Sequence, residues 1–143
     1  MKIFNSLFIF LFLLSAALQY NDPDPYIWMP LYLYAALLCY RALKGKYNPT
    51  LYIAGLLVYV SYAVYLFFND TGVQSWYGQH DAESIVQSMK ATKPWIEETR
   101  EFFGLLLLVL ALTVNMIVLR KQRNLAIVKP APSSLHSKAS HSI

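Results

Sequence analysis

The sequence predicts an all-α protein, a four-helix bundle that spans a membrane. Of its 143 residues, 57% are hydrophobic and 14% are charged, whereas soluble domains carry roughly 25% charged residues. The apolar residues gather into four uncharged runs, at residues 3–18, 26–40, 51–68 and 102–119. Each run approaches the ~20 residues that cross a bilayer core as a helix. The roughly ten-residue alternating segments typical of a membrane β-barrel are not seen.

These runs divide the chain into a membrane domain over residues 1–123 and a tail over residues 124–143. The predicted spans cover about residues 3–19, 26–43, 50–68 and 95–120, once interfacial residues are added. The first two loops are short. The third loop is longer and lies on the outer side, with a predicted short surface helix over residues 81–91. The tail is polar and contains serines and two prolines, so we expect a disordered cytoplasmic segment.

The basic residues predict how the chain is oriented. They cluster in the second loop and directly after the last span, at Arg41, Lys44, Lys46, Arg120, Lys121 and Arg123. By the positive-inside rule these clusters are cytoplasmic, which places both termini inside. We expect the protein in the plasma (cytoplasmic) membrane. All eight acidic residues then fall on the outer side. The net charge of +4 comes from the inner flanks, and no basic face is left for nucleic acid.

The first apolar run has two interpretations. A charged start at Lys2 and a small-residue pattern near Ala17 are also found in cleaved secretory signal peptides. We favour a retained first helix, because the run is long for a signal peptide and carries polar residues in helical register. Asn5, Phe8 and Phe12 share one face with later polar residues. That face is expected to point into the bundle.

The first loop, residues 19–25, is explained largely by local structure. Asp24 and Pro25 are typical of a helix N-cap followed by proline at the first helical position, where the missing N–H costs nothing. Asn21 begins a predicted Asx-type turn. Capping leaves Asp22 unexplained. This residue continues the polar face of the first helix from Gln19.

A polar cluster is predicted at the outer membrane face, where the first, second and fourth spans end or begin. Its members are Gln19, Asp22, Asp24, Glu97, Arg100 and Glu101. We expect Arg100 to form an ion pair with Asp22 or Asp24, and Glu101 and Gln19 to complete the network. Helix caps and an ion pair explain these residues without a ligand, so no metal is assigned. The alternative is a hard cation held by the carboxylates.

Further residues are predicted to pack the helices together. They are Tyr52, Gly55, Tyr59 and Tyr62 on the third span, and Gly104 and Asn115 on the fourth. Buried hydroxyl and amide groups need partners in lipid, and glycine lets helices approach closely. The alternative for the tyrosines is a path for a ligand. The single cysteine, Cys39, can form no intramolecular disulfide and is predicted to be a packing residue.

Two separated segments resemble the transmembrane protein 220 family. They are residues 19–32, QYNDPDPYIWMPLY, and residues 97–105, EETREFFGL. The Asn-Asp-Pro-Asp loop is the more specific motif, and the Arg-Glu-x-x-Gly segment is the second. The resemblance covers the spans from about residue 14 to residue 119 and leaves out the tail. It implies a small multi-helix membrane protein with a retained first helix, and it assigns no activity.

No catalytic residue and no cofactor are predicted. The three histidines, His80, His136 and His141, lie outside the spans, which excludes histidine ligation of haem inside the membrane. No nucleophile elbow, phosphate loop or zinc spacing occurs. The spans also hold no ionisable residue at mid-depth, which disfavours ion-coupled transport.

Two functions therefore remain. The first is a non-catalytic membrane protein that lies in the lipid bilayer and packs with a membrane-protein partner or with a second copy of itself. The alternative is a small carrier, or a lipid- or quinone-binding protein, that uses the tyrosine-lined interior.

Overall fold

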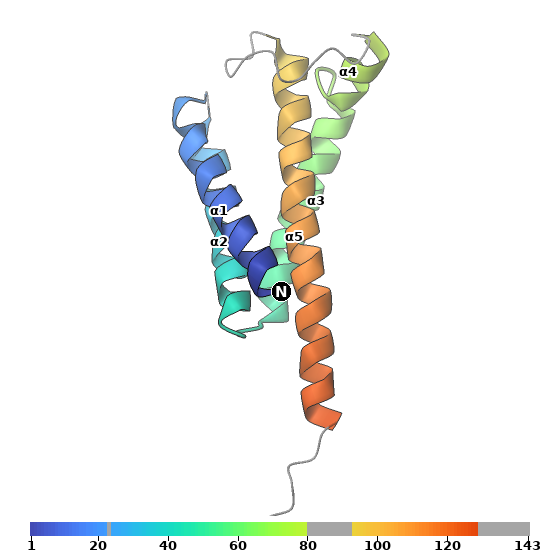
Figure 1. Cartoon of the computed structure of the whole chain (residues 1–143). Coiled ribbons are helices and arrows are strands. Elements are labelled where there is room, and N and C mark those ends of the chain that lie inside the picture. Colours follow the sequence, from blue (N-terminus) through green and yellow to red (C-terminus); the bar gives the residue numbers. More distant parts are fainter. Residues whose placement is uncertain (23, 80–92, 129–143) are drawn as a thin grey trace, which may run out of the picture.

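The computed structural model describes residues 1–22, 24–79 and 93–128. Its elements are α1 (Lys2–Leu18), the 3-10 turn η1 (Gln19–Asn21), α2 (Pro25–Leu43), α3 (Pro49–Phe68), α4 (Val73–Gln79) and α5 (Pro94–Val128) (Figure 1). The all-α prediction is confirmed. The predicted surface helix over residues 81–91 lies outside the described residues, as do residues 129–143 of the predicted tail.

Two boundaries differ from the sequence prediction. Helix α5 continues to Val128, so residues 124–128 are helical and do not belong to an irregular tail. Residues 120–123, which precede them, are good helix formers. The helix extends beyond the other helices (Figure 1). The short helix α4 was not predicted, because residues 73–79 show no clear helical period of apolar residues.

Three described stretches are long and apolar enough to cross a membrane. They are Lys2–Asn21, Pro49–Gln79 and Pro94–Ile127. Helix α2 is not among them, because its tyrosines, its internal Pro30 and its Arg41 lower the hydropathy. It is nevertheless 19 residues long, which is close to the ~20 residues of a spanning helix. Its length therefore fits a span, although its hydropathy does not identify it as one.

The helices form two antiparallel pairs. Helix α1 packs along α2, and α3 packs along α5; packing is closer within each pair than between them. Figure 1 shows the α1–α2 pair leaning away from α5 toward the end that holds the α1–α2 loop. The short loop of residues 22–24 after η1 allows only an antiparallel neighbour.

The sizes of the buried side chains explain this lean. At the loop end, α2 buries Trp28 and Tyr32, which are large; toward the other end it buries Ala35, Ala36, Cys39 and Ala42. Small side chains let helices approach closely, and aromatic rings hold them apart. Gly55 of α3 lies in the close region, where an added Cβ would be 2.8 Å from Leu112 and 2.9 Å from Tyr34.

Tyrosine hydroxyls join the two pairs. Three of them donate to main-chain carbonyl oxygens across the pairs: Tyr34 to Leu51 (2.9 Å), Tyr52 to Leu38 (3.0 Å) and Tyr59 to Leu31 (2.8 Å). Each carbonyl can accept a second hydrogen bond while it keeps its helical one. Tyr62 instead packs its ring against Trp28, with 5.4 Å between ring centroids. The predicted tyrosine stripe therefore lies between helices.

A pair of asparagines fixes α1 to α5. Asn115 donates its Nδ2 to Asn5 Oδ1 at 2.7 Å, and it also approaches Cys39 Sγ at 3.6 Å. Asn5 donates in turn to the Met1 carbonyl at 3.1 Å. Asn5, Cys39 and Asn115 are all buried. An amide buried in a membrane protein needs such a partner, so this contact makes α1 an integral part of the bundle.

Replacing Tyr59 by phenylalanine tests the tyrosine contacts. The ring stays, and only the bond to the Leu31 carbonyl is lost, so we expect the free energy of unfolding to fall by about 1 kcal/mol. This free energy is measured by unfolding the protein in mixed micelles with an increasing fraction of denaturing detergent. The matched control is Tyr65→Phe, because Tyr65 is 59% exposed. Equal effects of the two substitutions would contradict a role for the Tyr59 hydroxyl.

Candidate functional site

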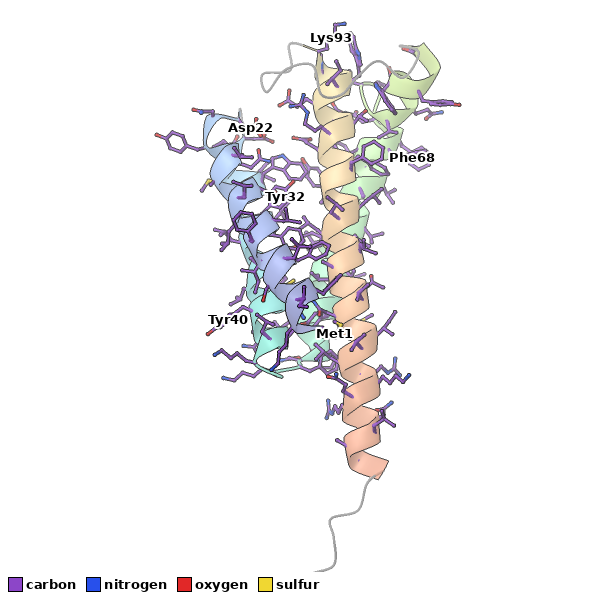
Figure 2. The ribbon with its side chains drawn as sticks, viewed as in Figure 1. Met1, Asp22, Tyr32, Tyr40, Phe68 and Lys93 are labelled. Carbon is purple, nitrogen blue, oxygen red and sulfur yellow. The ribbon has the colours of Figure 1, made fainter. Side chains whose placement is uncertain are left out.

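The acidic residues of α5 and of the α1–α2 loop lie at one end of the bundle, which we call the carboxylate end. It consists of residues 19–22 and 24–28 and the first three turns of α5. Figure 2 places Asp22 and Lys93 at this end, with Tyr32 deeper and Tyr40 toward the opposite end. Polar residues far apart in the sequence are therefore brought together where the two helix pairs spread apart.

Three carboxylates form the centre of the carboxylate end. Asp24, Glu97 and Glu101 each offer one oxygen atom, and these oxygens lie within 4.8 Å of one another. Glu97 and Glu101 are four residues apart, so they share one face of α5. Asp24 comes from the start of α2. All three side chains are partly buried. We call this group the carboxylate triad.

The predicted capping role of the Asp24 side chain is wrong. Asp24 does occupy the N-cap position of α2, and Pro25 is the first helical residue as predicted, but the Asp24 side chain makes no capping hydrogen bond. Its main-chain oxygen accepts from the Ile27 nitrogen at 3.1 Å. Because Pro25 has no N–H, fewer donors need a cap at this helix start. The Asp24 carboxylate is left to face α5.

Asp22 and Arg100 lie at the edge of the triad. Burial and the neighbouring Asp24 carboxylate raise the pKa of Asp22 above its usual range, and the Arg100 guanidinium offsets part of this rise. Arg100 is therefore near enough to act on the Asp22 charge, but burial and the acidic neighbour dominate. The ion pair of Arg100 with Asp22 or Asp24 stays a prediction. Negative charge is in excess at the carboxylate end.

Trp28 belongs to the site, and the sequence analysis missed it. An aromatic residue at the start of a span is expected at the lipid interface, yet Trp28 is 0% exposed. Its indole nitrogen is buried without a hydrogen bond of ordinary geometry, and it interacts with the Glu101 side chain. Its position four residues after Asp24 was the signal, because the two residues share one face of α2.

Tyr32, Gln19 and Gly104 form the floor beneath the triad. An added Cβ at Gly104 would lie 2.5 Å from the Tyr32 hydroxyl oxygen, so any larger residue would have to displace the Tyr32 side chain. The Gln19 side chain forms a hydrogen bond with the Tyr32 hydroxyl. Gly104 follows Glu101 by three residues and lies on the same face of α5. The floor is therefore neutral and polar.

Glu98 makes a separate contact between α3 and α5. The Asn69 amide donates to one Glu98 oxygen at 2.8 Å, and the Thr71 hydroxyl donates to the other. Asn69 and Thr71 follow α3, so these bonds attach the end of α3 to the N-terminal part of α5. Glu98 was not among the predicted site residues. Its partners, 27 and 29 residues away in the chain, left no local signal.

Substituting alanine at Gly104 tests the fit of the floor. The added methyl group overlaps the Tyr32 hydroxyl, and overpacking of this kind costs about 1–3 kcal/mol. In a Tyr32→Phe background the nearest ring atom is 3.7 Å away, an ordinary contact, so the substitution should cost much less there. The test compares the unfolding free energies of four proteins, namely the unchanged protein, Gly104→Ala, Tyr32→Phe and the double variant. Gly78→Ala is the control, because an added Cβ there meets nothing within 4 Å. An equal cost in both backgrounds would refute the contact.

Comparison with known proteins gives one family. The family model described as "Transmembrane family 220, helix" matches residues 11–117. Neither a curated protein nor a solved structure matches the chain. The match runs from the middle of α1 to residue 117 of α5, so it includes the carboxylate triad, its floor and the tyrosine contacts. The chain is an integral membrane protein that belongs to transmembrane family 220.

Proposed function

We propose that this protein is a non-catalytic membrane protein that acts by contact with a membrane-protein partner or with a second copy of itself. The observation that carries the proposal is that the polar groups of the tyrosine stripe are used within the bundle. Tyr52 and Tyr59 donate to carbonyl oxygens of α2, and the Tyr62 ring packs on Trp28. These contacts support a packing role for the stripe.

The same contacts argue against the alternative, a small carrier or a lipid- or quinone-binding protein. Binding a quinone inside the bundle requires free donors and an apolar cavity. The Tyr52 and Tyr59 hydroxyls already have partners, and both side chains are 1% exposed. A ligand would have to break these bonds in an environment that offers no water in exchange.

The chemistry of the described residues also supports a protein without catalytic activity. Cys39 is fully buried and lies against Asn115, so it is not placed to act as a nucleophile. The charged groups among the described residues of the carboxylate end are carboxylates and one arginine, Arg100. Covalent catalysis by a hydroxyl or a thiol needs that nucleophile beside a base, and the carboxylate triad contains neither a hydroxyl nor a thiol.

The orientation belongs to the same proposal. We infer four membrane crossings, with the carboxylate end outside, both termini in the cytoplasm and the plasma membrane as location. The support is the separation of charge along the bundle. Lys44 and Lys46 follow α2, and Arg120 and Lys121 lie in the last part of α5, at the end opposite the triad (Figure 1). Basic residues flank spans on the cytoplasmic side.

Exposed aromatic residues at the carboxylate end are candidates for the contact. Tyr20 is 78% exposed and Tyr26 is 74% exposed, one on each side of the α1–α2 loop. Tyrosine is enriched in protein interfaces because it supplies a large, rigid surface with a polar group. It is also common at the membrane interface, so a binding experiment has to separate the two roles.

Native mass spectrometry of the protein, extracted from its membrane into nanodiscs without detergent, tests the proposed function. We expect a reproducible second protein or a dimer, and we expect Tyr20→Ala with Tyr26→Ala to reduce it at least tenfold. Leu57→Ala is the control, because Leu57 is 64% exposed in the middle of α3. A stoichiometric lipid or quinone on a single chain would contradict the proposal and support the carrier.

A further inference from the structure

We propose that the carboxylate triad of Asp24, Glu97 and Glu101 binds a hard divalent cation, with Ca²⁺ as the best-fitting ion. This inference goes beyond the proposed function and does not depend on it. It starts from geometry. Ca²⁺ binds oxygen ligands at about 2.3–2.6 Å, so oxygens on opposite sides of one ion are up to about 5 Å apart. The triad oxygens lie within 4.8 Å of one another.

The ligands come from two helix starts that the fold holds in place. Asp24 is the N-cap residue of α2, and its carboxylate is not used for capping. Glu97 and Glu101 lie one turn apart near the start of α5. Three monodentate carboxylates leave room for the further oxygens, water among them, that complete the six to eight ligands of Ca²⁺. Soft metals would instead prefer sulfur or imidazole ligands.

Electrostatics favours a cation at this position. Glu101 is close to the acidic groups of Asp24, Glu97 and Glu98. The Arg100 charge acts on Asp22 and on Glu97, and it offsets only part of the effect of burial and of the acidic neighbours on these two groups. Carboxylates this close repel one another in a partly buried site. A bound divalent ion would replace that repulsion by attraction.

Trp28 provides an independent observation. The whole side chain is 0% exposed, and its Nε1 is buried without a hydrogen-bond partner of ordinary geometry. The indole is nevertheless directed to the Glu101 side chain. A carboxylate that ligates an ion through one oxygen has a second oxygen for a donor, and such outer donors orient metal ligands. A small movement of Glu101 toward an ion would let the N–H group bind this second oxygen.

Gln19 completes the surroundings. Its Oε1 atom is buried and has no hydrogen-bond partner, while its side chain is held by the Tyr32 hydroxyl beneath the triad. An unpaired buried oxygen is costly unless an ion, a water molecule or a donor meets it. A hydrated ion above the floor would bring water molecules to this oxygen.

Isothermal titration calorimetry of the protein in nanodiscs of uncharged lipid, with CaCl₂ as the titrant, tests the site. We expect one ion per chain and a Kd of about 0.1–1 mM, the range of extracellular calcium modules. Binding should raise the midpoint of thermal unfolding in proportion to the logarithm of the ion concentration above Kd. Choline chloride of equal ionic strength controls for screening.

The variants Glu97→Gln and Glu101→Gln keep the size of the side chains and remove one charge each. Both should weaken Ca²⁺ binding at least tenfold. Because each also removes a repulsive charge, the unfolding midpoint without calcium should stay equal or rise, which separates loss of the ion from loss of the fold. Asp70→Asn is the matched control, since Asp70 is exposed and outside the triad. The Asp70→Asn variant should bind Ca²⁺ with the same affinity as the unchanged protein.

Two results would overturn the proposal. One is the absence of a heat of binding up to 10 times the expected Kd, with an unfolding midpoint that calcium does not move beyond the choline control. The other is calcium binding that Glu97→Gln and Glu101→Gln leave unchanged, or that Asp70→Asn reduces equally. Either result would make the triad a group of surface carboxylates without a resident ion. MgCl₂ in place of CaCl₂ should give weaker binding, because Mg²⁺ requires a stricter octahedral set.

Discussion

Polar groups inside a membrane protein must find partners within the protein, and three tyrosine hydroxyls meet this constraint by binding main-chain oxygens across the two helix pairs. The rest of the structure depends on this arrangement. Packing is close within the pairs and sparser between them, so directional bonds fix how one pair sits against the other. The Asn5–Asn115 contact adds a further point of attachment between α1 and α5.

The carboxylate end follows from how the pairs meet. Small residues of α2 allow close approach at one end, and Trp28 with Tyr32 holds the pairs apart at the other. The space so created admits charged side chains that could not enter a closely packed region of the bundle. Trp28 contributes to the spacing of the helix pairs through its ring, and it interacts with the Glu101 side chain through its indole nitrogen. Packing and polar chemistry therefore share one residue.

The sequence was enough to predict the all-α membrane architecture, the helix ends to within a few residues, except at the end of α5, and the family. Uncharged runs and proline positions are local signals, and helix starts at Pro25, Pro49 and Pro94 follow from them. That Asp24, Glu97 and Glu101 lie at the same end of the bundle was also predictable, since α-helical spacing and loop length bring them together.

The contacts within that set could not be read from the sequence. The tyrosine stripe was recognised, but its acceptors are main-chain oxygens, which carry no sequence signal. Trp28 stands at the start of a span, where an aromatic residue is expected at the lipid interface, and its burial depends on the splay between the pairs. The Asp24 side chain was expected to cap α2, and nothing local indicated that it faces α5 instead. Glu98 depends on partners about 28 residues away.

The central claim is that the two helix pairs form one fixed body, so that Asp24 is held opposite Glu97 and Glu101. Distances between spin labels at Tyr26 and Leu106 test it directly, since both residues are exposed and lie on different pairs. The buried Cys39 is replaced by alanine to prevent labelling. Pulsed electron resonance in nanodiscs should give one narrow distance distribution. A broad distribution, or two separate distances, would show that the pairs move independently and would contradict the account.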